Sequence, residues 1–188
     1  MADQVQFILD RLAPSFKLAG DLGIFSQDEI RSIVKKTRDF EYVLKRRELY
    51  PSDFSAYVNY KVTLEKLQFM RCNVRSAAAT KEQKNAYRSL QGTSIKHICY
   101  IYDRATRRFP GEMGLWYTYI DFLQVKKSYS ILNNIFGRVL ALNPKNENLW
   151  IKAAVHEFSN NNNAHAARSL YQTALRKHQL SGRLWLKY

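Results

Sequence analysis

The chain has 188 residues, of which 46% are hydrophobic and 13% aromatic, enough to bury a core in one domain or a short repeat array. Its 30 lysines and arginines outnumber 16 acidic residues, and the resulting charge of +14 favours polyanionic partners such as RNA or acidic proteins. No stretch approaches the roughly 18 consecutive apolar residues of a membrane span, so we expect no membrane association.

Helix-forming residues dominate the chain, and only seven glycines and four prolines interrupt them, which predicts an all-α fold. Residues 1–50 are predicted to form an N-terminal helical segment. Within it, Ser26 and Glu29 match a capping box, which predicts that a long helix starts there.

Residues 51–110 resemble a degenerate form of the repeat that follows them. Pro51 starts a new helix, and Phe54 stands where later repeats carry tryptophan. From about residue 71 to 93 the apolar pattern gives way to Ser, Ala, Thr, Lys, Gln and Gly. We therefore predict an insertion or a mobile loop over 71–93, which includes Ala77 to Ala79.

Tryptophans mark a regular repeat in residues 111–188. They lie 34 and 35 residues apart, at Trp116, Trp150 and Trp185. A fixed offset of roughly 20 to 50 residues is typical of a solenoid. Aliphatic–aromatic pairs keep the same step: Ile101-Tyr102, Ile135-Phe136 and Leu170-Tyr171.

Each repeat is predicted to be a pair of antiparallel helices, because both series also carry apolar side chains at helical spacing. One pair cannot bury its apolar face alone, so neighbouring pairs should stack into a right-handed α-solenoid. Two repeats are complete and a third begins near residue 185, from which we expect a fragment of a longer protein. The predicted repeat core is Phe54, Tyr57, Tyr102, Trp116, Tyr119, Phe136, Trp150, Tyr171 and Trp185.

The repeat resembles the half-a-TPR, or HAT, motif. Trp116 and Tyr119 match its Trp-x-x-Tyr first helix, and Tyr102-Asp103-Arg104-Ala105 and Phe136-Gly137-Arg138-Val139 match its second helix. A tetratricopeptide repeat would carry glycine four residues after the tryptophan, where this chain has Ile120 or Ala154. Gln179 departs from the proline expected at that place. HAT proteins act in RNA-processing assemblies.

The N-terminal stretch is similar to one HAT family, the U3 small nucleolar RNA-associated protein 6 family. The resemblance covers essentially the whole chain and implies a non-catalytic scaffold of the small-subunit processome, located in the nucleus and nucleolus. It also implies WD-repeat protein partners of the UTP-B subcomplex and proximity to pre-rRNA and U3 RNA. The motifs that carry it are Gly23-Ile24-Phe25, Glu29-Ile30, Lys35-Lys36, Asp39-Phe40-Glu41, Arg47 and Asp53-Phe54 with Tyr57 and Tyr60.

Two other functions remain open at this point. A HAT scaffold of splicing or of mRNA 3′-end processing would have the same fold in another assembly. A direct RNA-binding module would use a basic surface, and sequence-independent, salt-sensitive binding would indicate it.

That basic surface is predicted on Lys35, Lys36, Arg38, Lys45, Arg46 and Arg47. It could contact a polyanion or partner, or it could be a solvated helix surface.

The sequence predicts neither an enzyme nor a cofactor. No two of the four histidines have the four-residue spacing of a helical metal pair, and Cys72 and Cys99 have no metal-site or disulfide spacing. Gly111 to Gly114 lacks the ending of a phosphate-binding loop, and no acidic pair or nucleophile motif is recognisable.

Overall fold

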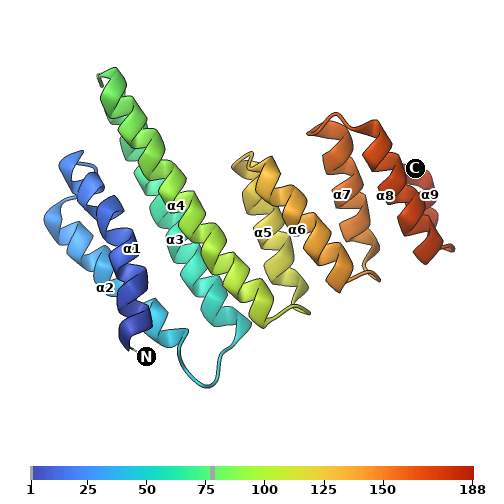
Figure 1. Cartoon of the computed structure of the whole chain (residues 1–188), viewed down its shortest axis with the longest axis horizontal. Helices are drawn as coiled ribbons and strands as arrows, with labels where there is room; N and C mark the ends of the chain where they lie inside the picture. The colour runs from blue at the N-terminus through green and yellow to red at the C-terminus, as the bar shows by residue number, and fades with distance from the viewer. Residues whose placement is uncertain (1, 77–78) are drawn as a thin grey trace. The chain divides into compact units, whose positions relative to one another are not determined.

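The computed structural model describes residues 2–76 and 79–188. These residues form helices and no strands, so the predicted all-α fold is confirmed. None of the described helices combines the length and apolar character that crossing a bilayer requires. The helices in chain order are α1 (Ala2–Asp21), α2 (Gln27–Val43), α3 (Pro51–Ser76), α4 (Lys81–Arg108), α5 (Met113–Val125), α6 (Tyr129–Leu142), α7 (Glu147–Ser159), α8 (Ala164–Lys177) and α9 (Gly182–Lys187) (Figure 1).

The chain divides into two compact units: an N-terminal unit that ends at Arg108 and a C-terminal unit from Phe109 to Tyr188. The N-terminal unit contains α1 to α4, in which α1 packs on α2 and α3 packs on α4. The C-terminal unit contains the pairs α5–α6 and α7–α8, followed by α9, which packs on α7 and α8. Each unit is described by itself below.

The predicted capping box is present at the start of α2. Ser26 Oγ accepts a hydrogen bond from the Glu29 backbone N–H at 3.2 Å, and Ser26 N–H donates to Glu29 Oε2 at 2.8 Å. Gly23 makes the preceding turn with φ of +64°, and a Cβ there would lie 2.9 Å from Arg75 Nη1. The turn between α1 and α2 therefore needs glycine for its backbone conformation, whereas the Arg75 guanidinium, at the end of a flexible side chain, can move to make space.

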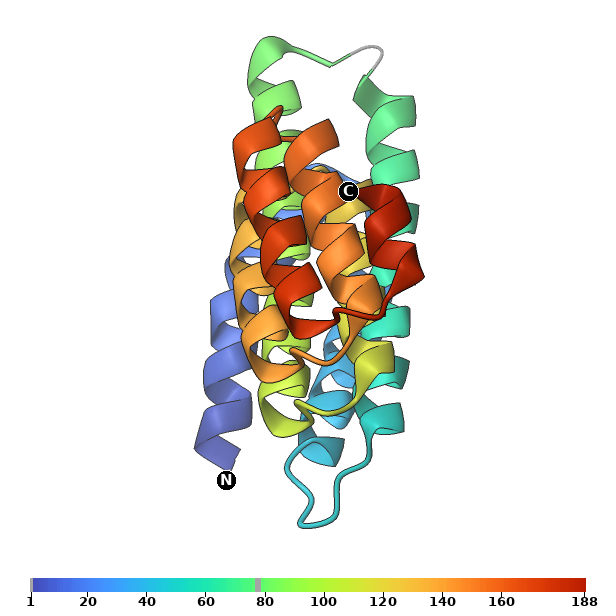
Figure 2. The same cartoon turned by 90° about the vertical axis from the view of Figure 1, so that its right-hand side faces the viewer.

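Of the two alternatives for residues 71–93, the mobile loop is wrong for the residues that the structure describes, whereas the insertion stays a prediction. Instead, α3 continues to Ser76 and α4 begins at Lys81, and Figures 1 and 2 both show these two long helices running alongside each other. Ala77 and Ala78 lie outside the described residues. The region is helical because widely spaced apolar side chains in it bury against α1 and α2. This cluster is Ala19, Ile24, Phe25, Ile33, Cys72, Tyr87 and Leu90.

Helix ends in the C-terminal unit follow local side-chain chemistry. Asn143-Pro144 ends α6, as the sequence predicts, because proline cannot continue the helical hydrogen bonds. At the start of α8, Asn163 Oδ1 accepts a hydrogen bond from the Ala166 backbone N–H at 3.0 Å.

Candidate interaction surfaces and the core that supports them

The repeat tryptophans each tie a helix to the turn before it. In every case the indole Nε1–H donates to the backbone carbonyl six residues earlier. A backbone carbonyl is present whatever the side chain, so glutamine in place of proline at position 179 keeps the bond. The three bonds are Trp116 to Pro110 at 2.9 Å, Trp150 to Pro144 at 3.0 Å and Trp185 to Gln179 at 3.2 Å.

The same proline carbonyls also receive a contact from the end of the same helix pair. Asn143 Nδ2 donates to the Pro110 carbonyl at 3.3 Å, and His178 Nε2 lies 3.0 Å from the Pro144 carbonyl. Asn143 and His178 occupy equivalent positions just after the second helix of their pairs. Each carbonyl therefore joins the first helix of its own pair to the end of the second helix.

Most of the predicted repeat-core residues are buried, but Trp185 is not. Its side chain is 58% exposed, and α9, which carries it, packs on α7 and α8. The assignment of Trp185 to the repeat core therefore stays a prediction. The buried members are Phe54, Tyr57, Tyr102, Trp116, Tyr119, Phe136, Trp150 and Tyr171.

A buried ion pair joins α2 to α4 in the N-terminal unit. The Glu41 side chain is fully buried, and both its oxygens accept hydrogen bonds from the Arg104 guanidinium at 2.8 Å. Arg104 belongs to the HAT-like second-helix motif and Glu41 to the N-terminal motif, but no sequence pattern pairs the two residues. The two lie 63 residues apart, beyond the reach of helical periodicity.

Lys61 of α3 is buried next to this pair. Its Nζ donates to Thr37 Oγ1 at 2.7 Å, and Thr37 Oγ1 in turn donates to the Ile33 carbonyl at 2.7 Å. Burial lowers the pKa of Lys61 to about 7, although the Glu41 carboxylate opposes this shift. Burial together with Glu41 raises the pKa of Tyr57 far above its ordinary value.

Replacing Lys61 by methionine should change how stability depends on pH. The folded chain releases the Lys61 proton near pH 7, whereas the unfolded chain holds it to about pH 10.5. Because the unfolded state binds more protons in this window, Lys61 should make stability rise with pH, by up to about 1.4 kcal/mol per unit. Urea unfolding between pH 7 and about 10 should show this rise in the parent and a smaller one in Lys61→Met. The matched control is Lys66→Met, because Lys66 lies on the same helix and is exposed. If the slope of unfolding free energy against pH is the same in Lys61→Met as in the parent, Lys61 does not have the lowered pKa assigned to it.

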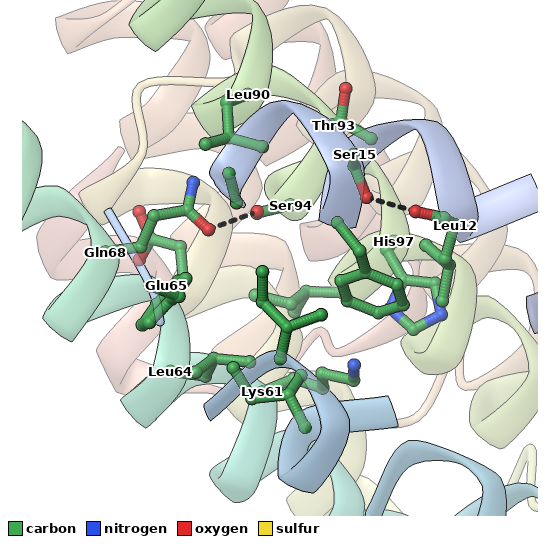
Figure 3. Close-up of a pocket in the computed structure, with 16 residues that line it drawn as sticks. Leu12, Ser15, Lys61, Leu64, Glu65, Gln68, Leu90, Thr93, Ser94 and His97 are labelled. Carbon is green, nitrogen blue, oxygen red and sulfur yellow. Dashed lines mark hydrogen bonds between the residues drawn. The ribbon is translucent and has the colours of Figure 1, made fainter. Parts of the chain in front are cut away.

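A cavity of about 40 Å³ lies inside the N-terminal unit, where α1, α2, α3 and α4 meet (Figure 3). Ser94 Oγ donates to Gln68 Oε1 across it at 3.0 Å, and His97 also lines it. A space of this size holds water molecules and is too small for a metabolite or an organic cofactor.

The predicted basic surface lies on α2 and the turn after it. Lys45 is half-buried and its Nζ donates to Gln4 Oε1, while Lys36 Nζ lies 5.6 Å from the centroid of the Tyr60 ring. The exposed members are Lys35, Lys36, Arg38, Arg46 and Arg47. No described contact distinguishes a polyanion surface from a solvated one, so the assignment stays a prediction.

No group of three or more His, Cys, Asp or Glu side chains that could hold a metal ion occurs in the described parts of the chain.

Two protein-family models match the chain, and they overlap between residues 74 and 97. Residues 9–97 match the model for U3 small nucleolar RNA-associated protein 6. Residues 74–188 match the model for the pre-mRNA-splicing factor Syf1/CNRKL1 N-terminal HAT repeat. The N-terminal match falls within the unit of α1 to α4, and the HAT match includes the repeat tryptophans.

Curated relatives match over the whole chain. "U3 small nucleolar RNA-associated protein 6" of Schizosaccharomyces pombe is 34% identical over 100% of the chain and 37% of its own length. The homologues of the same name from Homo sapiens and Mus musculus are 28% and 29% identical, each over 100% of the chain and 30% of their own length. The chain therefore spans about a third of the length of these relatives.

Proposed function

Because the chain belongs to the HAT-repeat proteins and, among them, to the U3 small nucleolar RNA-associated protein 6 family, we propose that it is a non-catalytic scaffold of the small-subunit processome. The observation that carries this proposal is the alignment of similarly named yeast, human and mouse relatives along the full chain. In this role the protein acts in the nucleolus, close to U3 RNA and pre-rRNA, during processing of pre-18S rRNA. Because the relatives are about three times longer, the activity and partners of the whole protein are part of the proposal.

The partners we propose are WD-repeat proteins of the UTP-B subcomplex. Helical repeats commonly bind partners along their helix faces, and those faces must be held rigidly to be recognised. The indole-to-carbonyl bonds of the C-terminal unit and the Glu41–Arg104 pair of the N-terminal unit supply such support. These side chains stabilise the packing of the helices, which fits a protein whose helix faces bind partner proteins.

A scaffold in splicing is the second candidate, because the HAT model that matches residues 74–188 takes its name from a splicing factor. The match covers the repeats, which can recur in different assemblies. Residues 9–97 instead match the U3-associated family, and the relatives of that name extend over both parts. We therefore favour the processome.

Depletion of the protein that carries this chain should separate the two candidates. We expect unprocessed 18S precursor to accumulate on northern blots and mature 18S rRNA to fall relative to the large-subunit rRNA, with the tagged protein in the nucleolus. Accumulation of unspliced mRNA with normal 18S processing would instead support the splicing role and overturn the processome proposal.

A further inference from the structure

A cleft of about 160 Å³ lies between α1 and α4 of the N-terminal unit. Its α4 wall is a single helical stripe, because Thr93, Lys96, His97 and Tyr100 follow one another at i, i+3, i+4 and i+7. Its α1 wall includes Arg11. The basic residues predicted on α2 take no part in it, so the cleft is a separate feature of the surface.

The cleft brings two uncompensated cations together. Arg11 and Lys96 are exposed and belong to opposite walls. Among the residues that the structure describes, neither forms an ion pair with a carboxylate. Like charges that share a cleft raise the local positive potential and favour an anion there.

His97 lines both the cleft and the cavity, and Figure 3 shows it at the cavity. Its Nε2 is buried and has no hydrogen-bond partner in the described structure. Burial, with the positive charges of Lys61, Arg104 and Arg11, lowers its pKa to about 3, so the imidazole is neutral near pH 7. The positive charge of the cleft therefore comes from Arg11 and Lys96.

An exposed aromatic ring lies one helical turn from each cation, and of these two rings Tyr100 lines the cleft whereas Phe7 lies outside its lining. On α1, Phe7 is 62% exposed, and the Arg11 guanidinium carbon lies 5.9 Å from its ring centroid. On α4, Tyr100 is 38% exposed and stands four residues after Lys96. Cations that hold phosphates, alternating with aromatic rings that stack on bases, are typical of single-stranded nucleic-acid sites. A phosphorylated peptide would use the cations and would leave the rings without a role.

We propose that the α1–α4 cleft binds single-stranded RNA, with Arg11 and Lys96 holding a backbone phosphate and Tyr100 stacking on an adjacent base. The scaffold role requires proximity to RNA but no direct contact through this cleft. The two proposals therefore stand or fall separately.

Fluorescence anisotropy of the purified chain with a short fluorescein-labelled oligouridine tests the cleft. Arg11→Gln/Lys96→Gln should weaken binding on the order of 10-fold at physiological salt and reduce the slope of log affinity against log salt by about 1 to 2. Lys35→Gln/Lys36→Gln removes the same charge from α2 and should change affinity less than about 2-fold. An equal loss in both variants would show that binding follows net charge alone and would overturn the proposal.

Tyr100→Leu separates base stacking from phosphate binding. It should weaken oligouridine binding about 10-fold and leave the binding of inorganic phosphate unchanged, with thermal unfolding used to check that the variant is folded. In ¹⁵N NMR, the His97 ring nitrogens should shift with oligouridine and with phosphate. Shifts with a phosphoserine peptide but none with oligouridine would assign the cleft to a phosphoprotein, and an unresponsive His97 would exclude it as an anion site. Either result overturns the RNA site.

Discussion

Replacing Trp116 by alanine should lower the free energy of unfolding of the C-terminal unit by about 3–5 kcal/mol. The indole is fully buried, so its removal leaves a large cavity in the first helix pair. The change also removes the 2.9 Å hydrogen bond to the Pro110 carbonyl and the contact with Arg138, whose guanidinium carbon lies 5.6 Å from the Trp116 ring. Urea unfolding followed by far-UV circular dichroism measures the loss.

Trp185→Ala is the matched control, because Trp185 makes the equivalent bond to the Gln179 carbonyl but is 58% exposed. It should cost no more than about 1 kcal/mol. Equal costs at the two positions would mean that the hydrogen bond, and not the burial of the ring, carries the stability. That result would contradict the assignment of Trp116 as a core residue.

Replacing Arg104 by methionine should destabilise the N-terminal unit by about 3–5 kcal/mol, because it leaves the fully buried Glu41 carboxylate without its partner. The change also removes the guanidinium that lies over the Tyr100 ring at 4.8 Å. Chemical denaturation of the parent and variant at neutral pH gives the difference.

The double variant Glu41→Met/Arg104→Met tests whether this cost comes from the isolated charge. Replacing both partners of a buried ion pair by apolar residues is often close to neutral, so the double variant should be more stable than Arg104→Met alone. If the Glu41→Met and Arg104→Met costs instead add in the double variant, the two side chains do not act as a pair.

The helices and the repeat could be predicted from the sequence because their signals are local or periodic. The capping box of Ser26 and Glu29 marks the start of α2, and Asn143-Pro144 marks the end of α6. The tryptophan spacing identifies the repeating unit without any knowledge of contacts. Local motifs and regular spacings can both be read from the sequence without knowing which residues are in contact in the fold.

The long α3–α4 pair was missed because its buried residues are few and widely spaced. Cys72, Tyr87 and Leu90 are separated by small and charged residues that fit a loop as well as an exposed helix. What makes the region helical is burial against Ile24 and Phe25, and local periodicity cannot show which distant residues will cover a helix face.

The candidate sites were harder to predict for the same reason. The lysines and arginines of α2 and of the turn after it are close enough in the sequence to be noticed, but the contacts described for them, such as Lys45 with Gln4 and Lys36 with the Tyr60 ring, identify no external partner. Arg11 and Lys96 are unremarkable in the sequence, since neither has a lysine or arginine next to it. They become a candidate site because α1 packs on α4, which brings residues 85 positions apart to one cleft.

Affinity purification of the tagged protein, with and without nuclease, tests the scaffold role most directly. Mass spectrometry after nuclease treatment should recover WD-repeat processome proteins, because scaffold contacts are made between proteins, and RNA sequencing before treatment should show enrichment of U3 RNA. Recovery of splicing or 3′-end processing factors, or loss of every protein partner on nuclease treatment, would contradict the account.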